Sequence, residues 1–439
     1  MISLEWYLIL LIIFGSLVVL MATGLPVAFC FITINIVGTV IFFGFNGLEN
    51  IILSIYSNLN TFILLPIPLF ILMGEMMFHS GIGPVLIRVL EKWFGRLPGR
   101  LSLLAVAAGT LFSTLTGTSL ASVAILGSVL MPEMKERDYK ISMSAGPILG
   151  SSGLAMMIPP SALAVLAGAI AEISISKTLV GIIIPGLLLA AVYALYIVIR
   201  CWLQPSIAPV YETEPVPFSE KVRDTIKYVI PQGVIVFLVV GVIFLGVATP
   251  SEAAATGAMG TIFLALCYGR LNWEVIKKAS MGTISLTGML FLILCGSAAF
   301  SQLMAYSGAS AGLTQIATGL PVAPIYVVIA MQLVILFLGG FMDVVSIMMI
   351  TLPIFIPVIE ALDYSPVWFL VLFLLNIEMA GTSPPFGLSL FVMKGVVPED
   401  VKMSEIYTAA LPFLGLDLIV MVMIMIFPSL ALWLPHLLR

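Results

Sequence analysis

Apolar runs recur from one end of this chain to the other, and they restrict its fold more than any other feature. Crossing a bilayer core about 30 Å thick takes roughly 20 helical residues, and apolar runs of this kind begin at residue 4 and recur to the C-terminus. Hydrophobic residues make up 61% of the 439 and charged residues only 9%, whereas soluble domains carry about 25% charged residues. The sequence therefore predicts an all-α polytopic membrane protein without a separate soluble domain.

Two stretches inside the apolar sequence, residues 150–161 and 378–387, are broken by proline pairs. Each stretch places Gly, Ser or Thr beside Pro-Pro where lipid favours an unbroken helix. An unpaired backbone group in hydrocarbon costs several kcal/mol, so such a break persists only where it lines a cavity. We expect the freed carbonyls and half-helix ends to hold an ion or an anionic solute near the middle of the membrane.

The second half of the chain repeats features of the first half at an offset of about 223 residues. Pro159-Pro160 corresponds to Pro384-Pro385, and Gly117 corresponds to Gly340. Each half is predicted to contain about five spans, a re-entrant hairpin and a broken helix. The predicted units are a first repeat over residues 1–203, with its hairpin near 101–131 and its broken helix near 142–171, a proline-rich linker over 204–224, and a second repeat over 225–439, with its hairpin near 321–358 and its broken helix near 366–394.

Basic residues predict that the two repeats are inverted relative to each other. The loop at residues 88–100 is strongly basic, whereas its counterpart at 310–319 has no Lys or Arg. Because Lys and Arg collect on the cytoplasmic side, corresponding loops must lie on opposite sides of the membrane. This places the linker in the cytoplasm and the N-terminus outside, with residues 4–22, which lack a basic start and a small-residue cleavage site, as a retained helix.

The candidate ligand residues lie at the two hairpin tips and the two breaks. Sodium, a hard cation, suits five or six neutral oxygens, and half-helix amides attract a carboxylate. The alternative is that the breaks are proline kinks satisfied by neighbouring helices. The candidates are Thr116, Gly117, Thr118, Ser119, Gly150, Ser151, Ser152, Gly153, Ile158, Pro159 and Pro160 in the first half, and Gly339, Gly340, Asp343, Gly381, Thr382, Ser383, Pro384 and Pro385 in the second half.

Three acidic residues lie in apolar sequence, where a central carboxylate costs about 2.5 to 3.5 kcal/mol on insertion scales. Asp343, at the second tip, is the preferred acidic site residue, with a structural role as acceptor of helix-end amides as the alternative. Glu75 and Glu378 are equally explained as interfacial residues or as residues hydrogen-bonded within the bundle.

The sequence does not indicate an enzyme. Only two histidines exist, His79 and His436, and neither belongs to a metal-ligand cluster or a Ser/His/Asp set. No phosphate-binding G-x-x-x-x-G-K-[ST] motif is present. We therefore expect no cofactor other than a coupling ion, no transition metal and no nucleic-acid partner.

The motifs Gly150-Ser-Ser-Gly153 with Ile158-Pro-Pro-Ser161, Gly381-Thr-Ser-Pro-Pro385-x-Gly387 and Gly339-Gly-Phe-Met-Asp343 resemble the large membrane subunit of TRAP (tripartite ATP-independent periplasmic) transporters. The resemblance covers nearly the whole chain. It implies an elevator-type fold of the ion-transporter superfamily and sodium-driven uptake of an organic acid across a bacterial inner membrane. It also implies a periplasmic binding protein and a small four-helix membrane subunit, expected as a separate chain because this one begins directly at the first large-subunit span.

The same resemblance implies the arrangement of the site. One sodium ion would lie between residues 116–119 and the break near 150–160, a second between residues 339–343 and 381–385, and the substrate between the two tips. The hairpins and broken helices would move as a block against the first two spans of each half, braced by the interfacial stretches 46–60 and 271–280.

Other functions remain open at this stage. The main alternative is a stand-alone sodium- or proton-coupled carboxylate or anion carrier of the same superfamily. A channel, a membrane scaffold without transport of its own and, more distantly, an intramembrane hydrolase are the others. The substrate is also open among C4-dicarboxylates, sialic acid and other sugar acids, and keto acids, because in the binding-protein architecture a different chain largely makes that choice.

Overall fold

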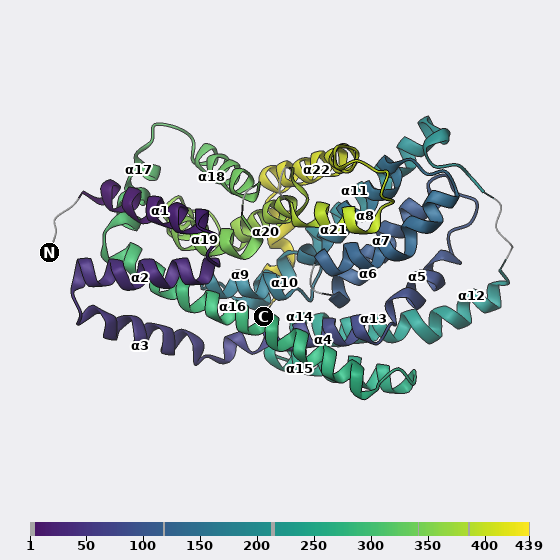
Figure 1. The fold of residues 1–439 in the computed structure, drawn as a ribbon, viewed down its shortest axis with the longest axis horizontal. Helices are drawn as coiled ribbons and strands as arrows, with labels where there is room; N and C mark the ends of the chain where they lie inside the picture. Colours follow the sequence, from purple (N-terminus) through teal and green to yellow (C-terminus); the bar gives the residue numbers. More distant parts are fainter. Residues whose placement is uncertain (1–4, 117–118, 212–215, 341, 385–386, 439) are drawn as a thin grey trace.

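The computed structural model describes residues 5–438 apart from 117–118, 212–215, 341 and 385–386, and Figure 1 shows its course. Helices dominate, and no β-strand occurs in the described part of the chain. The first half contains α1 (Trp6–Ala22), α2 (Val27–Phe43), α3 (Gly47–Leu59), α4 (Pro66–His79), α5 (Gly83–Glu91), α6 (Arg100–Thr116), α7 (Ser119–Glu136), α8 (Ile141–Met157), α9 (Ala162–Ile170), α10 (Ile175–Gly181) and α11 (Ile183–Leu203).

The second half begins with one long, locally unwound helix. Its parts are α12 (Phe218–Asp224), α13 (Ile230–Val236) and α14 (Val242–Phe244), joined by π-helical turns at Thr225–Val229 and Phe237–Gly241. The remaining helices are α15 (Pro250–Cys267), α16 (Trp273–Tyr306), α17 (Ala309–Gly319), α18 (Pro324–Gly339), α19 (Val344–Ala361), α20 (Pro366–Thr382), α21 (Leu388–Val396), α22 (Met403–Ile426) and α23 (Ser429–Leu437).

Several helices are long and apolar enough to cross a membrane. Among the described residues six meet this test, and a seventh span arises if α8 and α9, bent by 49° at their break, count as one. Shorter apolar helices, α1, α2, α6, α18 and α20 among them, accompany these spans. The predicted all-α polytopic membrane protein is confirmed.

The hairpins and broken helices interlock reciprocally. Each hairpin packs against the broken helix of its own half, α6 and α7 on α8, and α18 and α19 on α20. The second piece of each broken helix packs against the hairpin of the other half, α9 on α19 and α21 on α7. Figure 1 shows the two hairpins in opposite halves of the elongated molecule.

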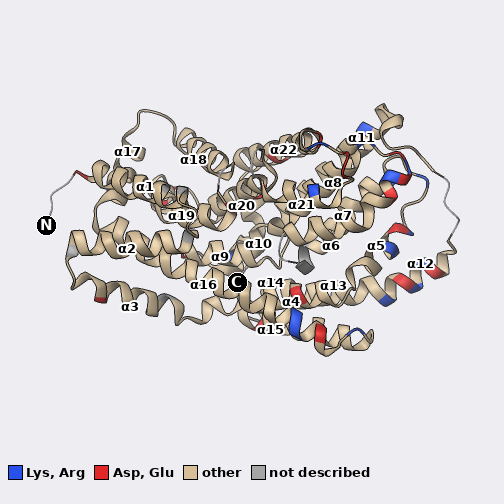
Figure 2. Cartoon of the chain, in the orientation of Figure 1, with Lys and Arg blue, Asp and Glu red and all other residues tan. Residues whose placement is uncertain are grey.

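Charge distinguishes the two ends of the molecule. Figure 2 shows Lys and Arg gathered at the end that contains α5, α7 and α12, whereas the end made by α1, α2, α3 and α17 shows none. The first Lys or Arg of the chain is Arg88, and α17 has no Lys or Arg. This is the asymmetry on which the positive-inside rule depends.

Two predicted boundaries differ from the structure. The linker predicted over residues 204–224 ends earlier, because α12 begins at Phe218 and continues into the apolar residues that follow. Residues 273–280 are not a separate interfacial brace, because they form the first turns of α16, which runs unbroken to Tyr306. In the first half, by contrast, the amphipathic α3 is a separate helix. Residues 60–65 divide it from α4, which begins with proline.

Candidate functional site

The second hairpin tip touches the second broken helix. Gly339, the last residue of α18, packs so tightly against Ala380 of α20 that a Cβ atom at Gly339 would lie 3.0 Å from the Cα of Ala380. Ala380 directly precedes the candidate Gly381. The structure therefore brings the predicted tip and the predicted break of the second half together.

The second break folds back tightly on itself. The backbone N–H of Gly387 donates to the carbonyl of Ser383 at 3.0 Å, and a Cβ atom at Gly387 would lie 2.7 Å from the carbonyl oxygen of Gly381. The hydroxyl of Thr382 donates to the carbonyl of Met379 at 3.2 Å. Only glycine fits at position 387, while the candidate Pro385 lies outside the described residues and Pro384 is half-buried.

Asp343 caps the start of α19. Its Oδ1 accepts hydrogen bonds from the N–H groups of Val345 at 3.0 Å and Ser346 at 3.1 Å, and its Oδ2 accepts one from the Ser346 hydroxyl. This is the amide-acceptor arrangement considered for Asp343. The residue is nevertheless exposed at the tip, while Gly340 closes α18 through an N–H bond to the carbonyl of Phe337.

The first break is shorter than the motif that marks it. Helix α8 continues to Met157, so only residues 158–161 are irregular. The N–H of Ile158 donates to the carbonyl of Leu154, and the Pro159–Pro160 peptide bond is cis. Ser161 caps the start of α9, its hydroxyl oxygen accepting from the N–H of Ala164 at 3.3 Å.

Residues 150–153 lie inside α8, more than a turn before the break, and form a close packing surface. The hydroxyls of Ser151 and Ser152 donate to carbonyls of their own helix, Ile148 at 3.3 Å and Leu149 at 2.7 Å. A Cβ atom at Gly150 would lie 2.5 Å from the ring of Phe413. Gly153 makes a similar close contact with the carboxyl group of Glu378.

The first hairpin tip is described in part. Thr116 ends α6 and Ser119 begins α7, where it is buried. The candidates Gly117 and Thr118 and the side chain of Thr116 lie outside the described residues. The hairpin meets the broken helix at Gly109, where a Cβ atom would lie 2.6 Å from the Cβ of Ser151.

Four buried polar side chains near the site were not singled out in the sequence, and these are Ser389, Asn376, Gln332 and Asp417. Ser389 is fully buried, and its hydroxyl has no hydrogen-bond partner within the described chain. Asn376 Nδ2 donates to the backbone and side-chain oxygens of Gln332, at 2.7 and 2.8 Å, which ties α20 to α18. Asp417 accepts a hydrogen bond from Tyr193. Asp417 was detectable in principle, because it is an acid within an apolar span.

The other two acids considered in the sequence occupy different environments. Glu75 Oε2 lies 3.2 Å from Nε2 of His79 and packs against Gly282 of α16, which places it at one end of α4. Glu378 lies in the core against α8. Neither is brought to a hairpin tip by the described contacts.

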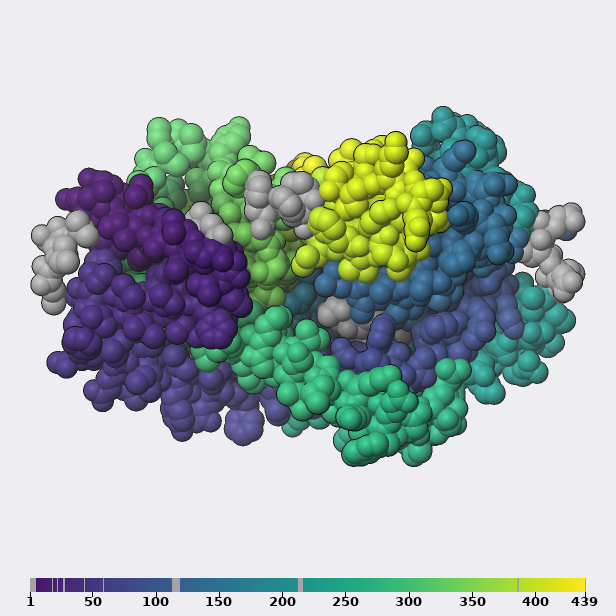
Figure 3. All heavy atoms as spheres, in the orientation of Figure 1, coloured from purple at the N-terminus to yellow at the C-terminus, as the bar shows by residue number. Residues whose placement is uncertain are grey.

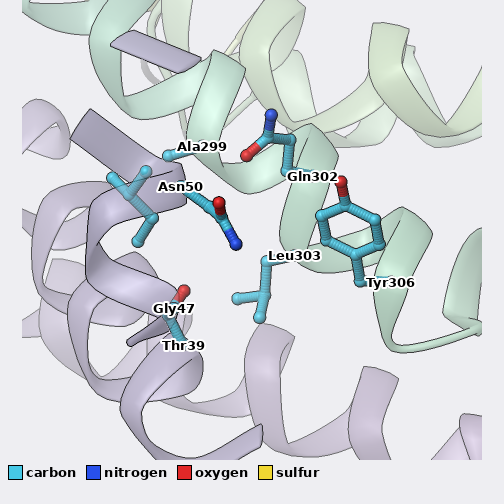
Figure 4. Close-up of a pocket in the computed structure, with 8 residues that line it drawn as sticks. Thr39, Gly47, Asn50, Ala299, Gln302, Leu303 and Tyr306 are labelled. Atoms are coloured by element: carbon cyan, nitrogen blue, oxygen red, sulfur yellow. The ribbon is translucent and has the colours of Figure 1, made fainter. Parts of the chain in front are cut away.

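A cavity of about 190 Å³ lies apart from the tips, between α2, α3 and α16. Figure 4 shows the amide of Asn50 directed into this space, close to Gln302 and Tyr306. Its lining is Thr39, Gly47, Asn50, Ile51, Ala299, Gln302, Leu303 and Tyr306, so it contains neither a charged group nor a predicted site residue. Nor does any part of the described chain group three His, Cys, Asp or Glu side chains as a metal site.

Broken helices that pack against hairpins in a polytopic helical protein are typical of secondary transporters. In Figure 3 the C-terminal helices, in yellow, pack beside blue helices of the first half, so the two halves share one body. Residues 14–430 match the family model described as the tripartite ATP-independent periplasmic transporter, DctM component. The chain belongs to this family, which confirms the resemblance inferred from the sequence and makes the protein a transporter component, not an enzyme.

Relatives match this chain over almost its full length. The C4-dicarboxylate TRAP transporter large permease protein DctM of Rhodobacter capsulatus is 29% identical over 98% of this chain and 99% of its own. The sialic acid TRAP transporter large permease protein SiaM of Vibrio cholerae is 26% identical over 97% and 98%. The crystal structure of the Alcanivorax borkumensis YdaH transporter shares the fold, with a TM-score of 0.60 at 17% identity over 89% of this chain and 90% of that one.

Proposed function

We propose that this protein is the large membrane subunit of a sodium-coupled secondary transporter that imports an organic acid. The observation that carries the proposal is the reciprocal packing of hairpins and broken helices, with Gly339 against Ala380 at the second tip. Membership of the transporter family supports it, as do relatives named for C4-dicarboxylate and sialic acid, both organic acids.

Two other components complete the proposed system. A small four-helix membrane subunit supports the large subunit, and a soluble periplasmic binding protein delivers the substrate, in keeping with the tripartite family. The system works in a bacterial inner membrane, with the basic end that contains α5, α7 and α12 in the cytoplasm.

We place one coupling ion in each half. The first sodium ion lies between the tip at residues 116–119 and the break that follows residues 150–153 and ends near Pro160. The second lies between the tip at residues 339–343 and the break at 381–385. Carbonyl and hydroxyl oxygens are the neutral ligands that suit a hard monovalent cation, and the substrate carboxylate lies between the two tips, near exposed half-helix amides.

Transport follows an elevator mechanism. Helices α6–α9 and α18–α21 move together against a scaffold of α1, α2, the helix over Phe218–Phe244, and α15. If two sodium ions enter with one carboxylate, one net positive charge crosses the membrane. At 100 mV this charge is worth about 2.3 kcal/mol, which corresponds to roughly 50-fold accumulation.

Uptake into proteoliposomes tests the proposal. The large and small subunits are reconstituted together, and labelled substrate is supplied on its binding protein. Uptake is expected to need external sodium, to increase with an inside-negative potential and to need the binding protein. Full uptake in sodium-free buffer would overturn sodium coupling, saturable uptake without the binding protein would indicate the stand-alone carrier, and flux that never exceeds equilibrium would indicate a channel.

A further inference from the structure

A buried acidic group lies in the core where α8, α11, α20 and α22 meet. Glu378 of α20 and Asp417 of α22 are each only 3% exposed. Helices α20 and α22 pack against each other and against α8. On α8, Gly153 touches the carboxyl group of Glu378, and Gly150 touches Phe413, which lies one turn before Asp417. The hydroxyl of Tyr193, in α11, donates a hydrogen bond to Oδ1 of Asp417. The group therefore joins residues from both halves of the chain.

Glu378 is the incompletely satisfied member of this group. Its Oε2 is buried and has no hydrogen-bond partner among the described residues. The carboxyl group lies against Gly153 of α8, where a Cβ atom would come within 2.7 Å of Cδ of Glu378. Because residue 153 has no side chain, α8 leaves room for this carboxyl group. Packing holds the carboxyl group in place, and the lone pairs of Oε2 remain available to bind a cation.

No basic side chain of the described chain compensates for the two acids. Helices α8 and α18, which pack against α20, contain no Asp, Glu, Lys, Arg or His. On the other helices that contact α20 or α22, the exposed charged or titratable residues include Lys177, Arg200, Glu360, Glu405 and His436. Lys394 donates to backbone carbonyls of the loop after α21. The buried titratable groups on the helices around Glu378 are therefore Asp417 and its hydrogen-bond partner Tyr193.

Two ionised carboxyl groups cannot remain side by side in this environment without a counter-ion, because burial disfavours each charge and the charges repel each other. We propose that Glu378 and Asp417 hold one monovalent cation between them, a proton or a sodium ion, at a site separate from the two tip sites. The inference rests on charge balance in the core, so it stands whether or not the tip sites bind sodium. A proton and a sodium ion would both neutralise the carboxyl pair, and the experiments below distinguish between them.

The first test measures the melting temperature of the purified full-length protein from low to high pH, in choline buffer and in sodium buffer. The cation binds the folded state, so the melting temperature of the wild type in choline is expected to fall as pH rises. Restoration by sodium identifies a sodium ion, and failure of sodium to restore it identifies a proton. In Glu378→Gln, a neutral variant of the same shape, this pH dependence is expected to be largely lost.

A matched control separates the site from general effects of charge. Glu360→Gln neutralises an exposed glutamate of α19 and is expected to keep the wild-type response. Equal pH and sodium responses in the wild type and in Glu378→Gln would overturn the proposal. Asp417→Asn serves as the second variant, with the same expected loss, if Glu378→Gln does not fold.

Infrared difference spectroscopy supplies a readout that a purely structural role does not change. If the cation is a proton, lowering the pH in choline buffer adds the carbonyl band of a protonated carboxyl group in the wild type and in Glu360→Gln. In Glu378→Gln and in Asp417→Asn that band is expected to change in frequency or in the pH at which it appears, because the remaining buried carboxyl group has lost its partner. A wild-type protein that shows neither this band nor a sodium response of its melting temperature would contradict the proposed site.

Discussion

At the scale of single residues, close glycine contacts connect the moving parts. Gly339→Ala is expected to lower sodium-dependent uptake, because the added methyl group overlaps Ala380 and displaces the backbone beside Gly381. Overpacking of this kind costs typically about 1–3 kcal/mol, so the melting temperature is also expected to fall. Uptake assays and thermal unfolding check both effects.

Gly15→Ala is the matched control for this substitution. Gly15 lies within α1, and a Cβ atom there would meet nothing within 4 Å. Alanine in an open helical position is neutral or slightly stabilising, because glycine is the poorer helix former. If Gly339→Ala transported and melted like Gly15→Ala, the contact between tip and break would not matter.

Some residue roles could be read from the sequence and others could not. Helical interruptions were visible because Pro and Gly act on the local backbone, as at Pro159-Pro160 and Gly387. The role of Gly150 and Gly153 was not visible, because it depends on which neighbouring helix each glycine faces. Asp417 carried the same signal as Glu378, an acid in an apolar span, and could have been identified with it.

At the scale of elements, an ion pair fastens the end of α5 to the helix that opens the second half. Lys92 Nζ lies 2.6 Å from Oδ2 of Asp224 and 2.7 Å from Oε1 of Glu220. These hydrogen bonds raise the pKa of Lys92. A raised lysine pKa contributes stability that is fully present below the ordinary pKa of about 10.4 and is lost as pH rises through the raised pKa.

Charge reversal tests this fastening. Lys92→Glu is expected to lower the free energy of unfolding at neutral pH, because it removes the ion pair and places a third acid beside Glu220 and Asp224. The repulsion adds no more than about 1 kcal/mol to the loss of the pair, because these side chains are partly exposed. Adding Glu220→Lys is expected to restore part of the melting temperature. A double variant no more stable than Lys92→Glu alone would show that the pair does not hold the two elements together.

Helix boundaries that depend on local sequence were predicted more closely than helix boundaries that depend on tertiary packing. The hairpin arms end at Gly, Thr and Ser positions that stand out in apolar sequence, so α6, α7, α18 and α19 lie near the predicted ranges. The start of α12 was missed, because a charged, amphipathic turn reads as linker although it continues a membrane helix. The length of α16 was missed because the polar residues at 271–280 were interpreted as an interfacial stretch, although residues 273–280 continue directly into the apolar part of the helix.

At the scale of the whole molecule, the inverted arrangement predicts which loops face which side. Arg223, 72% exposed by its side chain, lies at the basic end, and Val322, 48% exposed, precedes the second hairpin. In a variant with the exposed Cys267 replaced by serine, Arg223→Cys is expected to react with an impermeant maleimide only from the cytoplasm, and Val322→Cys only from the periplasm. Labelling of both from the same side would exclude inverted repeats.

Binding of radioactive sodium to the purified protein tests most directly whether paired breaks hold the coupling ions. The account predicts saturable binding that choline does not displace, with the component from the second half lost in Gly339→Ala and kept in Gly15→Ala. A wild-type protein without saturable sodium binding, or with binding equal in all three proteins, would contradict it.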